Sequence, residues 1–295
     1  MATISLKLNK EKIQTIKNTF KNDIKKSPNE YIDTFIQNDH LTISIYTSDK
    51  VVFQGDDAFF YASSFIDKKI NRQAGSDEVG TGDYFGPVCV CACIVEEDEF
   101  TILDELGVTD SKKIDDEKIK KIAPILIEKI KHSLLILDNI KYNVVHQNNN
   151  LNEIKAKLHN QAYINLLHKN YVIPKAAYVD EFAPKEKYFS YIKDEKEIFH
   201  DLVFETKAES MYPAVACASV IARYAFIKKM EELDNKYKMH FHFGAGQDVD
   251  SDILQFVKKY GINRLNEVAK LHFKNTEIIK RNSWSNFFFC IIKIA

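Results

Sequence analysis

Four acidic side chains stand where the chain could bring them together to bind metal ions. They are Asp77, Glu78, Asp180 and Glu209. The first two are adjacent in a glycine-rich stretch, while each of the others follows a short apolar segment typical of a buried strand. Acids at the strand ends of an α/β sheet can converge at one edge, where sites usually form. For any single acid the alternative is a solvated or ion-paired carboxylate, and for the adjacent pair it is a surface hairpin.

The shared placement of these acids determines the chemistry that we expect. Four carboxylates without cationic partners would repel one another, so their convergence implies bound cations. Hard oxygen ligands without a cluster of His or Cys favour Mg²⁺ or Mn²⁺ over Zn²⁺. Two such ions about 3.5–4 Å apart are the usual apparatus for attack of water on a phosphodiester, one activating the water and the other stabilising the leaving oxygen.

The acids are arranged around residues 75–95. The first part, Gly75–Pro87, has four glycines within twelve residues, which allows positive φ angles and a close approach of the backbone to another molecule. The second part, Val88–Val95, is apolar without alternation and predicts a strand buried on both faces. Cys89, Cys91 and Cys93 share one side of this strand. A thiolate metal cluster is the alternative there, but we expect small buried side chains.

Strands and helices alternate after this stretch and predict an α/β domain over residues 71–276. The expected helices include 115–130, 151–167 and 213–233, and the expected strands include 133–142, 176–180 and 202–206. Ala214, Ala218 and Ala222 give the longest helix a bare face for close packing on a sheet. Residues 277–295 form an apolar C-terminal tail to which the sequence assigns no role.

The first 70 residues predict a separate small α+β domain. We expect a helix from Asn9 to Lys26, strands at 41–46 and 51–55, and a second helix at 57–65. On the first helix Lys17, Lys21 and Lys25 recur at i, i+4 and i+8, so they would form one exposed ridge that could lie along a phosphate backbone. The alternative is an ordinary solvated helix face.

Composition and charge indicate a globular protein but do not indicate what it binds. At 295 residues, with 45% hydrophobic and 28% charged residues, the chain is globular and forms one large domain or two. Its 41 basic and 42 acidic residues nearly cancel, so nucleic-acid binding would have to come from local patches or metal ions. No apolar run reaches the about 18 residues of a spanning helix. Since no secretory leader precedes the five cysteines, we expect a cytoplasmic protein without membrane contact.

The sequence resembles bacterial ribonuclease HIII, of the type 2 ribonuclease H group, over nearly its whole length to about Thr276. The similarity is carried first by Gly75–Pro87. Further matching segments are 110–113, 155–161, 179–182, 207–210, 218–223, 244–246 and 269–273. The resemblance implies a ribonuclease H-like fold with a mixed central sheet and flanking helices, after a small domain like half of TATA-binding protein. It also implies endonucleolytic cleavage of the RNA strand of an RNA/DNA hybrid, leaving 5′-phosphate and 3′-hydroxyl ends.

The same resemblance assigns roles to individual residues. The catalytic and metal-binding acids of the family map onto Asp77, Glu78, Asp180 and Glu209, with Mg²⁺ or Mn²⁺ as cofactor and two ions during catalysis. The substrate-binding positions are Gly80, Thr81, Gly82, Lys112, Lys113, Lys207 and Ser210, together with the N-terminal Lys17, Lys21 and Lys25. In the family the glycine-rich turn reads ribose 2′-hydroxyls, which suits discrimination of RNA. The implied partner is the hybrid duplex, bound by a monomer with no protein partner.

Three features separate this interpretation from its alternatives. Glu209 and Thr81 stand where ribonuclease HII carries Asp and Arg, which favours cleavage of ribonucleotide runs over incision at a single ribonucleotide in DNA. The intact carboxylates count against a non-catalytic hybrid-binding protein. The glycine-rich turn and Lys207–Ser210 count against another nuclease or transposase of the same superfold. The departures from the family pattern are the tail after Thr276 and the acidic Asp248, where a basic loop is expected.

Overall fold

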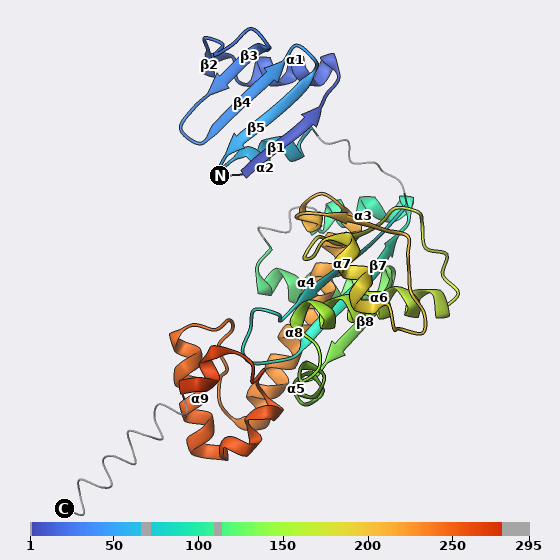
Figure 1. The fold of residues 1–295 in the computed structure, drawn as a ribbon, viewed down its shortest axis with the longest axis vertical. Coiled ribbons are helices and arrows are strands. Elements are labelled where there is room, and N and C mark those ends of the chain that lie inside the picture. Colours follow the sequence, from blue (N-terminus) through green and yellow to red (C-terminus); the bar gives the residue numbers. More distant parts are fainter. Residues whose placement is uncertain (1, 66–71, 109–113, 279–295) are drawn as a thin grey trace, which may run out of the picture. The chain divides into compact units, whose positions relative to one another are not determined.

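The computed structural model describes residues 2–65, 72–108 and 114–278 (Figure 1). The chain divides into two compact units, Met1–Lys69 and Ile70–Ala295. Each unit has its own sheet and its own hydrophobic core, so each is described by itself.

The N-terminal unit is a five-stranded antiparallel sheet with two helices on one face. Its elements are β1 (Ala2–Lys7), α1 (Lys10–Thr19), β2 (Ile24–Lys25), β3 (Ile32–Gln37), β4 (Leu41–Tyr46), β5 (Lys50–Gly55) and α2 (Ala58–Ser63). The strand order is β1-β5-β4-β3-β2, which makes β4 the central strand. Ile16 of α1, Ile43 of β4 and Ala62 of α2 share one apolar core.

The expected helix from Asn9 to Lys26 is shorter in the structure, where α1 ends at Thr19. A 3₁₀ turn and the edge strand β2 follow it, and β2 pairs with β3. The Asn and Asp of that turn are poor helix formers, and the sheet provides backbone hydrogen bonds that a longer helix would have made. Lys17, Lys21 and Lys25 consequently lie on three different elements, so the prediction of one continuous lysine ridge was wrong.

The second unit is built on a mixed five-stranded sheet of order β10-β9-β6-β7-β8. Strands β6, β7 and β8 are antiparallel neighbours, whereas β9 runs parallel to β6 and β10 parallel to β9. The strands are β6 (Gln73–Val79), β7 (Val88–Val95), β8 (Lys131–Leu137), β9 (Ala177–Asp180) and β10 (Leu202–Glu205). The α-helices are α3 (Phe100–Glu105), α4 (Asp116–Lys129), α5 (Asn139–His146), α6 (Leu151–His168), α7 (Lys185–Ile192), α8 (Pro213–Tyr237) and α9 (Gln247–Tyr260). Among the described residues, no helix is long and apolar enough to span a membrane.

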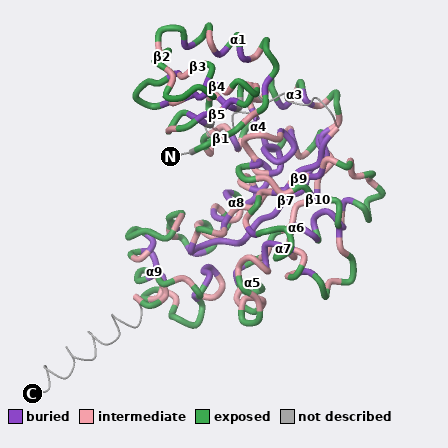
Figure 2. Tube along the Cα trace, turned by 45° about the horizontal axis from the view of Figure 1, so that its top comes forward, coloured by how far each residue is buried: buried purple, intermediate pink, exposed green. Residues whose placement is uncertain are grey.

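Helices cover both faces of this sheet. Helices α8 and α4 pack on the face that carries Cys89, Cys91 and Cys93, and helices α6 and α7 pack on the face that carries Val88 and Val90. Strand β7 is buried at every position (Figure 2), as its uninterrupted apolar sequence predicts. The described cysteines are buried free thiols, and burial raises the pKa of Cys89 to about 12, so they are packing groups rather than thiolate ligands.

The backbones of α8 and β6 come very close at Gly75. A β-carbon added at Gly75 would lie 2.4 Å from the backbone N of Val215 and 2.6 Å from the carbonyl C of Ala214. The buried alanines of α8, which include Ala214 and Ala218, allow this approach, as their spacing predicts. The same helix brings Ser219 to the side chain of Asp77.

Gly75→Ala should therefore destabilise the second unit by about 2–4 kcal/mol, because the added methyl group meets backbone atoms that no rotamer change can move. Thermal unfolding followed by circular dichroism would measure the loss. Gly82→Ala is the matched control, since a β-carbon there meets nothing within 4 Å. Equal melting temperatures for the two variants would contradict the close approach.

Candidate active site

Asp77 and Glu78 leave strand β6 on opposite faces of the sheet. In the antiparallel ladder Asp77 pairs with Cys91 and Glu78 pairs with Val90, so Asp77 faces α8 and Glu78 faces α6. The Glu78 N–H donates back to Asp77 Oδ1 at 2.8 Å, and the hydroxyl of Ser219 donates a second hydrogen bond to the Asp77 carboxylate. Two acids that are adjacent in the sequence therefore have different surroundings.

Asp180 and Glu209 come to the α8 face beside Asp77. Parallel pairing aligns Ser76 with Val179, and the next position in this register places Asp180 next to Asp77. Asp180 Oδ1 accepts a hydrogen bond from the Ala208 N–H at 3.3 Å, which holds the 3₁₀ turn 208–210 against the end of β9. Glu209 lies in that turn, near enough to act electrostatically on Asp77. Three of the four predicted acids thus gather at one edge of the sheet.

Glu78 is held on the other face by two residues of α6. Lys155 Nζ lies 2.5 Å from Glu78 Oε1, and His159 Nε2 lies 2.9 Å from Glu78 Oε2. Burial by itself raises the pKa of Glu78, but the hydrogen bond and charge of His159 and the charge of Lys155 outweigh it and lower the pKa to about 2. Glu78 is therefore ionised, and its charge is compensated within the chain.

Asp77 has the opposite electrostatic surroundings. Burial and the negative charges of Glu78 and Glu209 raise its pKa to about 8, against the hydrogen bonds from Ser219 and the Glu78 N–H. A divalent cation would supply the positive charge that these neighbours lack. The oxygen donors of Asp77, Asp180 and Glu209 suit Mg²⁺ or Mn²⁺. In the described part of the chain, however, no three His, Cys, Asp or Glu side chains are already arranged around an ion position, and Glu78 faces away from Asp77.

A groove of about 470 Å³ opens at the glycine-rich turn after β6. Gly80 has a φ of +96°, and a β-carbon there would lie 2.2 Å from the Pro87 carbonyl oxygen, so this position requires glycine. Gly82 has open space around it, which leaves the backbone accessible to another molecule. Arg223 lines the groove and is fixed by two hydrogen bonds, of 2.9 and 2.8 Å, to the Asp116 carboxylate.

Comparison with known proteins decides the family. Residues 74–276 match the ribonuclease HII family, and residues 3–78 match a domain of unknown function (DUF3378). Ribonuclease HIII from Streptococcus pneumoniae strain CGSP14 is 40% identical over 289 residues, which cover 95% of this chain and 99% of the relative. The chain belongs to the ribonuclease HIII family.

Solved structures agree with this assignment. The crystal structure of Bst-RNase HIII in complex with Mn²⁺ is 31% identical and has a TM-score of 0.70, over 94% of this chain and 97% of that chain. Aquifex aeolicus RNase H3, at 21% identity and a TM-score of 0.55, shares the fold. The family and fold expected from the sequence are confirmed, and with them an endonuclease of the ribonuclease HIII type, which cleaves RNA in RNA/DNA hybrids.

Of the other substrate residues expected of a ribonuclease HIII, the structure describes some and not others. Lys207 and Ser210 lie on the same turn as Glu209. Lys207 has a left-handed backbone with φ of +57°, and the Ser210 hydroxyl donates to Glu209 Oε1 at 3.2 Å. The predicted phosphate contacts Lys112 and Lys113 lie outside the described residues.

Sequence reasoning missed four residues that hold this ribonuclease HIII site in place. They are Lys155, His159, Ser219 and Lys270. All four lie in segments that match the family, and the i, i+4 spacing of Lys155 and His159 on an expected helix could have shown that these two share a face. Lys270 is wholly buried, and its ammonium donates to the carbonyl oxygens of Asp83, Phe85 and Gly86. No sequence signal indicates that a lysine so far along the chain fixes the loop before β7.

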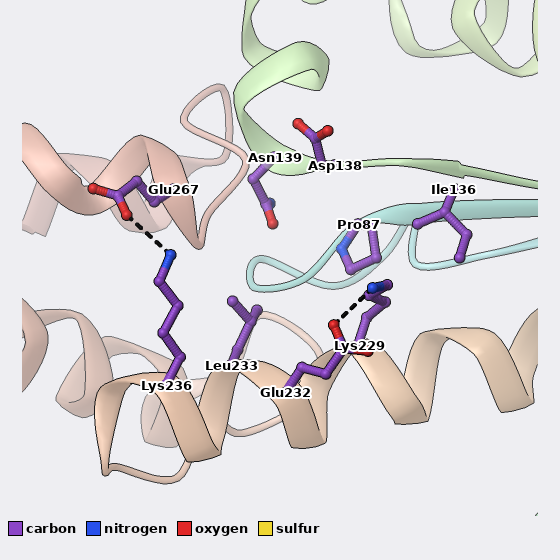
Figure 3. Close-up of a pocket in the computed structure, with 9 residues that line it drawn as sticks. All are labelled: Pro87, Ile136, Asp138, Asn139, Lys229, Glu232, Leu233, Lys236 and Glu267. Atoms are coloured by element: carbon purple, nitrogen blue, oxygen red, sulfur yellow. Dashed lines mark hydrogen bonds and ion pairs between the residues drawn. The ribbon is translucent and has the colours of Figure 1, made fainter.

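A second hollow of about 480 Å³ lies between the C-terminal half of α8 and the loop around Pro87 (Figure 3). Its two lysines are already paired. Lys229 lies 2.6 Å from Glu232, and Lys236 lies 3.3 Å from Glu267. The hollow therefore does not share the uncompensated charge of the Asp77 side of the ribonuclease HIII site.

Asp77→Asn should stabilise the metal-free protein at pH 8. Because the folded-state pKa of Asp77 is raised to about 8, the folded state binds a proton more strongly than the unfolded chain, and stability falls as the pH rises from about 4 to about 8. The neutral amide removes this loss, so the melting temperature in EDTA at pH 8 should rise by about 2–8 °C, with a smaller gain at pH 5.

The control for this prediction is Asp201→Asn, which changes an exposed acid of the same unit and should leave the melting temperature unchanged at both pH values. An Asp77→Asn gain that is equal at pH 5 and pH 8, or a loss of stability at pH 8, would contradict the electrostatic account.

Proposed function

We propose that this chain hydrolyses the RNA strand of RNA/DNA hybrids with two divalent ions held by Asp77, Glu78, Asp180 and Glu209. The observation that carries the proposal is the parallel pairing of β6 with β9, which sets two acids side by side next to the turn of Glu209. The relative Bst-RNase HIII was crystallised with Mn²⁺, which supports Mg²⁺ or Mn²⁺ as the cofactor of this chain.

The chain's own residues fix the geometry of the reaction. When bound, divalent ions supply an acidified water and a positive charge for the leaving oxygen. Asp77 is oriented beforehand by Ser219 and by the Glu78 N–H, and Asp180 is oriented by the Ala208 N–H. Both acids sit on paired strands of one sheet, so little reorganisation remains for the transition state. Attack of water on phosphorus with departure of the 3′-oxygen leaves 5′-phosphate and 3′-hydroxyl ends.

The glycine-rich turn is the proposed reader of the RNA strand. Gly80 gives the turn a backbone conformation that other residues rarely adopt, and Gly82 keeps one side of it open. Backbone groups exposed in this way can contact ribose 2′-hydroxyls without regard to base sequence. Lys207 and Ser210, on the turn of Glu209, and Lys112 and Lys113 are the proposed contacts to the adjacent phosphates. Thr81 lies between these two glycines and lines the same groove.

We propose that residues 1–70 bind the hybrid through the sheet face opposite α1 and α2. By register, the paired residues Lys7 and Lys50 share this face, and Lys25 joins it through its pairing with Phe35. The same face carries the uncharged polar side chains of Thr3, Ser5, Gln37, Thr42 and Gln54, together with Phe35, Tyr46 and Val52. Such groups suit the shallow minor groove of a hybrid, and lysines suit the phosphates at its edges.

The other two predicted lysines of this unit fit the proposal differently. Lys17 forms an ion pair with Asp33 at 2.6 Å, and Lys21 is exposed in the 3₁₀ turn after α1. The exposed Lys21 remains a proposed phosphate contact, whereas the paired Lys17 would have to give up Asp33 first.

We further propose that residues 71–276 act as the catalytic domain of a monomeric, cytoplasmic enzyme. No role is assigned to residues 277–295, of which 279–295 lie outside the described residues. All four acids come from one unit of one chain. No contribution from a second subunit is needed to complete this set.

Asp77→Asn and Glu209→Gln should each reduce cleavage of a labelled RNA/DNA hybrid in Mg²⁺ by at least about 10³-fold, because each removes a charged ion ligand while keeping its size. Binding of the hybrid in EDTA, measured by fluorescence anisotropy, should stay within about twofold. Glu181→Gln is the control, since it changes an exposed acid directly after Asp180 and should cleave normally. Turnover like that of the wild type by Asp77→Asn or Glu209→Gln would contradict the assignment of the site.

The combined variant Lys7→Ala, Lys25→Ala and Lys50→Ala should bind the hybrid more weakly at low salt, with little change in the cleavage rate of bound substrate. Each lost phosphate contact should flatten the slope of log Kd against log salt by about 0.9, because fewer counterions are released. Lys17→Ala is the control, since Lys17 is already paired with Asp33. An unchanged salt slope in the combined variant would exclude this sheet face as the binding surface.

A further inference from the structure

Glu78 differs from Asp77 in having a cation of its own. Lys155 Nζ lies 2.5 Å from Glu78 Oε1, and each of these two side chains is 11% exposed. His159 Nε2 contacts the other oxygen, Oε2, at 2.9 Å. Both carboxylate oxygens of Glu78 are therefore engaged by side chains of the same helix, α6.

The position of Lys155 is fixed by its neighbours. Its ammonium lies 3.9 Å from the centroid of the Phe182 ring, and the His159 ring lies over the same phenyl ring at 5.6 Å. His159 is completely buried, and its Nδ1 lies 2.8 Å from the Ser76 hydroxyl oxygen. Since they are four residues apart, Lys155 and His159 lie on the same side of α6. Lys155 is thus a counter-ion built into the fold, held where water reaches it poorly.

We propose that Lys155 is a positioning residue that competes with divalent ions for Glu78, an inference that rests on the proposed metal site. In the free enzyme its ammonium neutralises Glu78 and keeps the carboxylate on the α6 face. A divalent ion that recruits Glu78 must weaken this contact, whereas the charged groups that act on Asp77 are the acids Glu78 and Glu209. The contact therefore disfavours full ion loading before the phosphates of the substrate add their negative charge.

Lys155→Met tests this proposal, because methionine has a similar length and can still pack on the Phe182 ring but carries no charge. Isothermal titration of Mn²⁺ into the free enzyme should show binding that is tighter by on the order of tenfold, since Glu78 has lost a charged hydrogen-bond donor that competed with the ion. Lys157→Met is the matched control. It changes a lysine of the same helix whose partner Glu195 lies at 3.4 Å, and Mn²⁺ binding should not change.

Unchanged or weaker Mn²⁺ binding by Lys155→Met would overturn the proposal. If Lys155 had a purely structural role, Lys155→Met would leave the Mn²⁺ affinity unchanged. If Lys155 prepared Glu78 for the ion, the substitution would lower the Mn²⁺ affinity. In a Glu78→Gln background, Lys155→Met should have no further effect on Mn²⁺ binding, and a remaining tenfold gain would also overturn the proposal.

Other results of these measurements also bear on the proposal. If Lys155→Met does not fold without metal, its thermal unfolding is measured with and without Mn²⁺. Cooperative unfolding that returns with Mn²⁺ supports the proposal, and no recovery counts against it. A wild type that binds no Mn²⁺, or an Asp77→Asn variant that binds it as well as the wild type, would instead overturn the proposed metal site itself.

Discussion

The close packing of α8 against β6 at Gly75 is the contact on which the catalytic unit depends. It brings two backbones to a distance that no larger residue permits, and it does so two residues before Asp77. The helix thereby shields one side of the Asp77 carboxylate, places the Ser219 hydroxyl against it, and contributes to the burial that raises its pKa. The raised pKa of this carboxyl group therefore depends on core packing as much as on the neighbouring charges.

Much of the catalytic unit could be predicted because its sequence pattern agrees with its tertiary structure. Strand β7 is apolar throughout and is buried throughout, and the alanines of α8 meet the sheet as their spacing indicates. Asp180 and Glu209 could be found because they follow strand-like segments. Asp77 and Glu78 were expected in a glycine-rich turn, whereas the structure places them on strand β6, whose alternation puts them on opposite faces. The partners of Glu78 could not be predicted, since they depend on which helix packs on that face.

The N-terminal unit shows the opposite case, in which tertiary contacts override local preference. The periodicity of apolar residues after Asn9 continues past the true end of α1, but Lys25 is taken up by an edge strand that pairs with Phe35. Over so short a segment, the spacing of apolar residues fits both a helix and a half-buried strand. Lysines that a helix would align are instead distributed over different surfaces, and only the strand register shows that Lys25 shares a face with Lys7 and Lys50.

The hold of Lys270 on the loop before β7 has a consequence for the synthesis of this protein. The loop is made early, yet the ammonium that binds its carbonyl oxygens is added nearly two hundred residues later. At about 5–20 residues per second, a ribosome needs on the order of ten seconds or more to cover that distance. During this interval the nascent chain already contains Asp77 and Glu78 but lacks the anchor for the adjoining loop. A nascent chain that ends before Lys270 therefore lacks the buried cation that holds the carbonyl oxygens of Asp83, Phe85 and Gly86 in the finished protein.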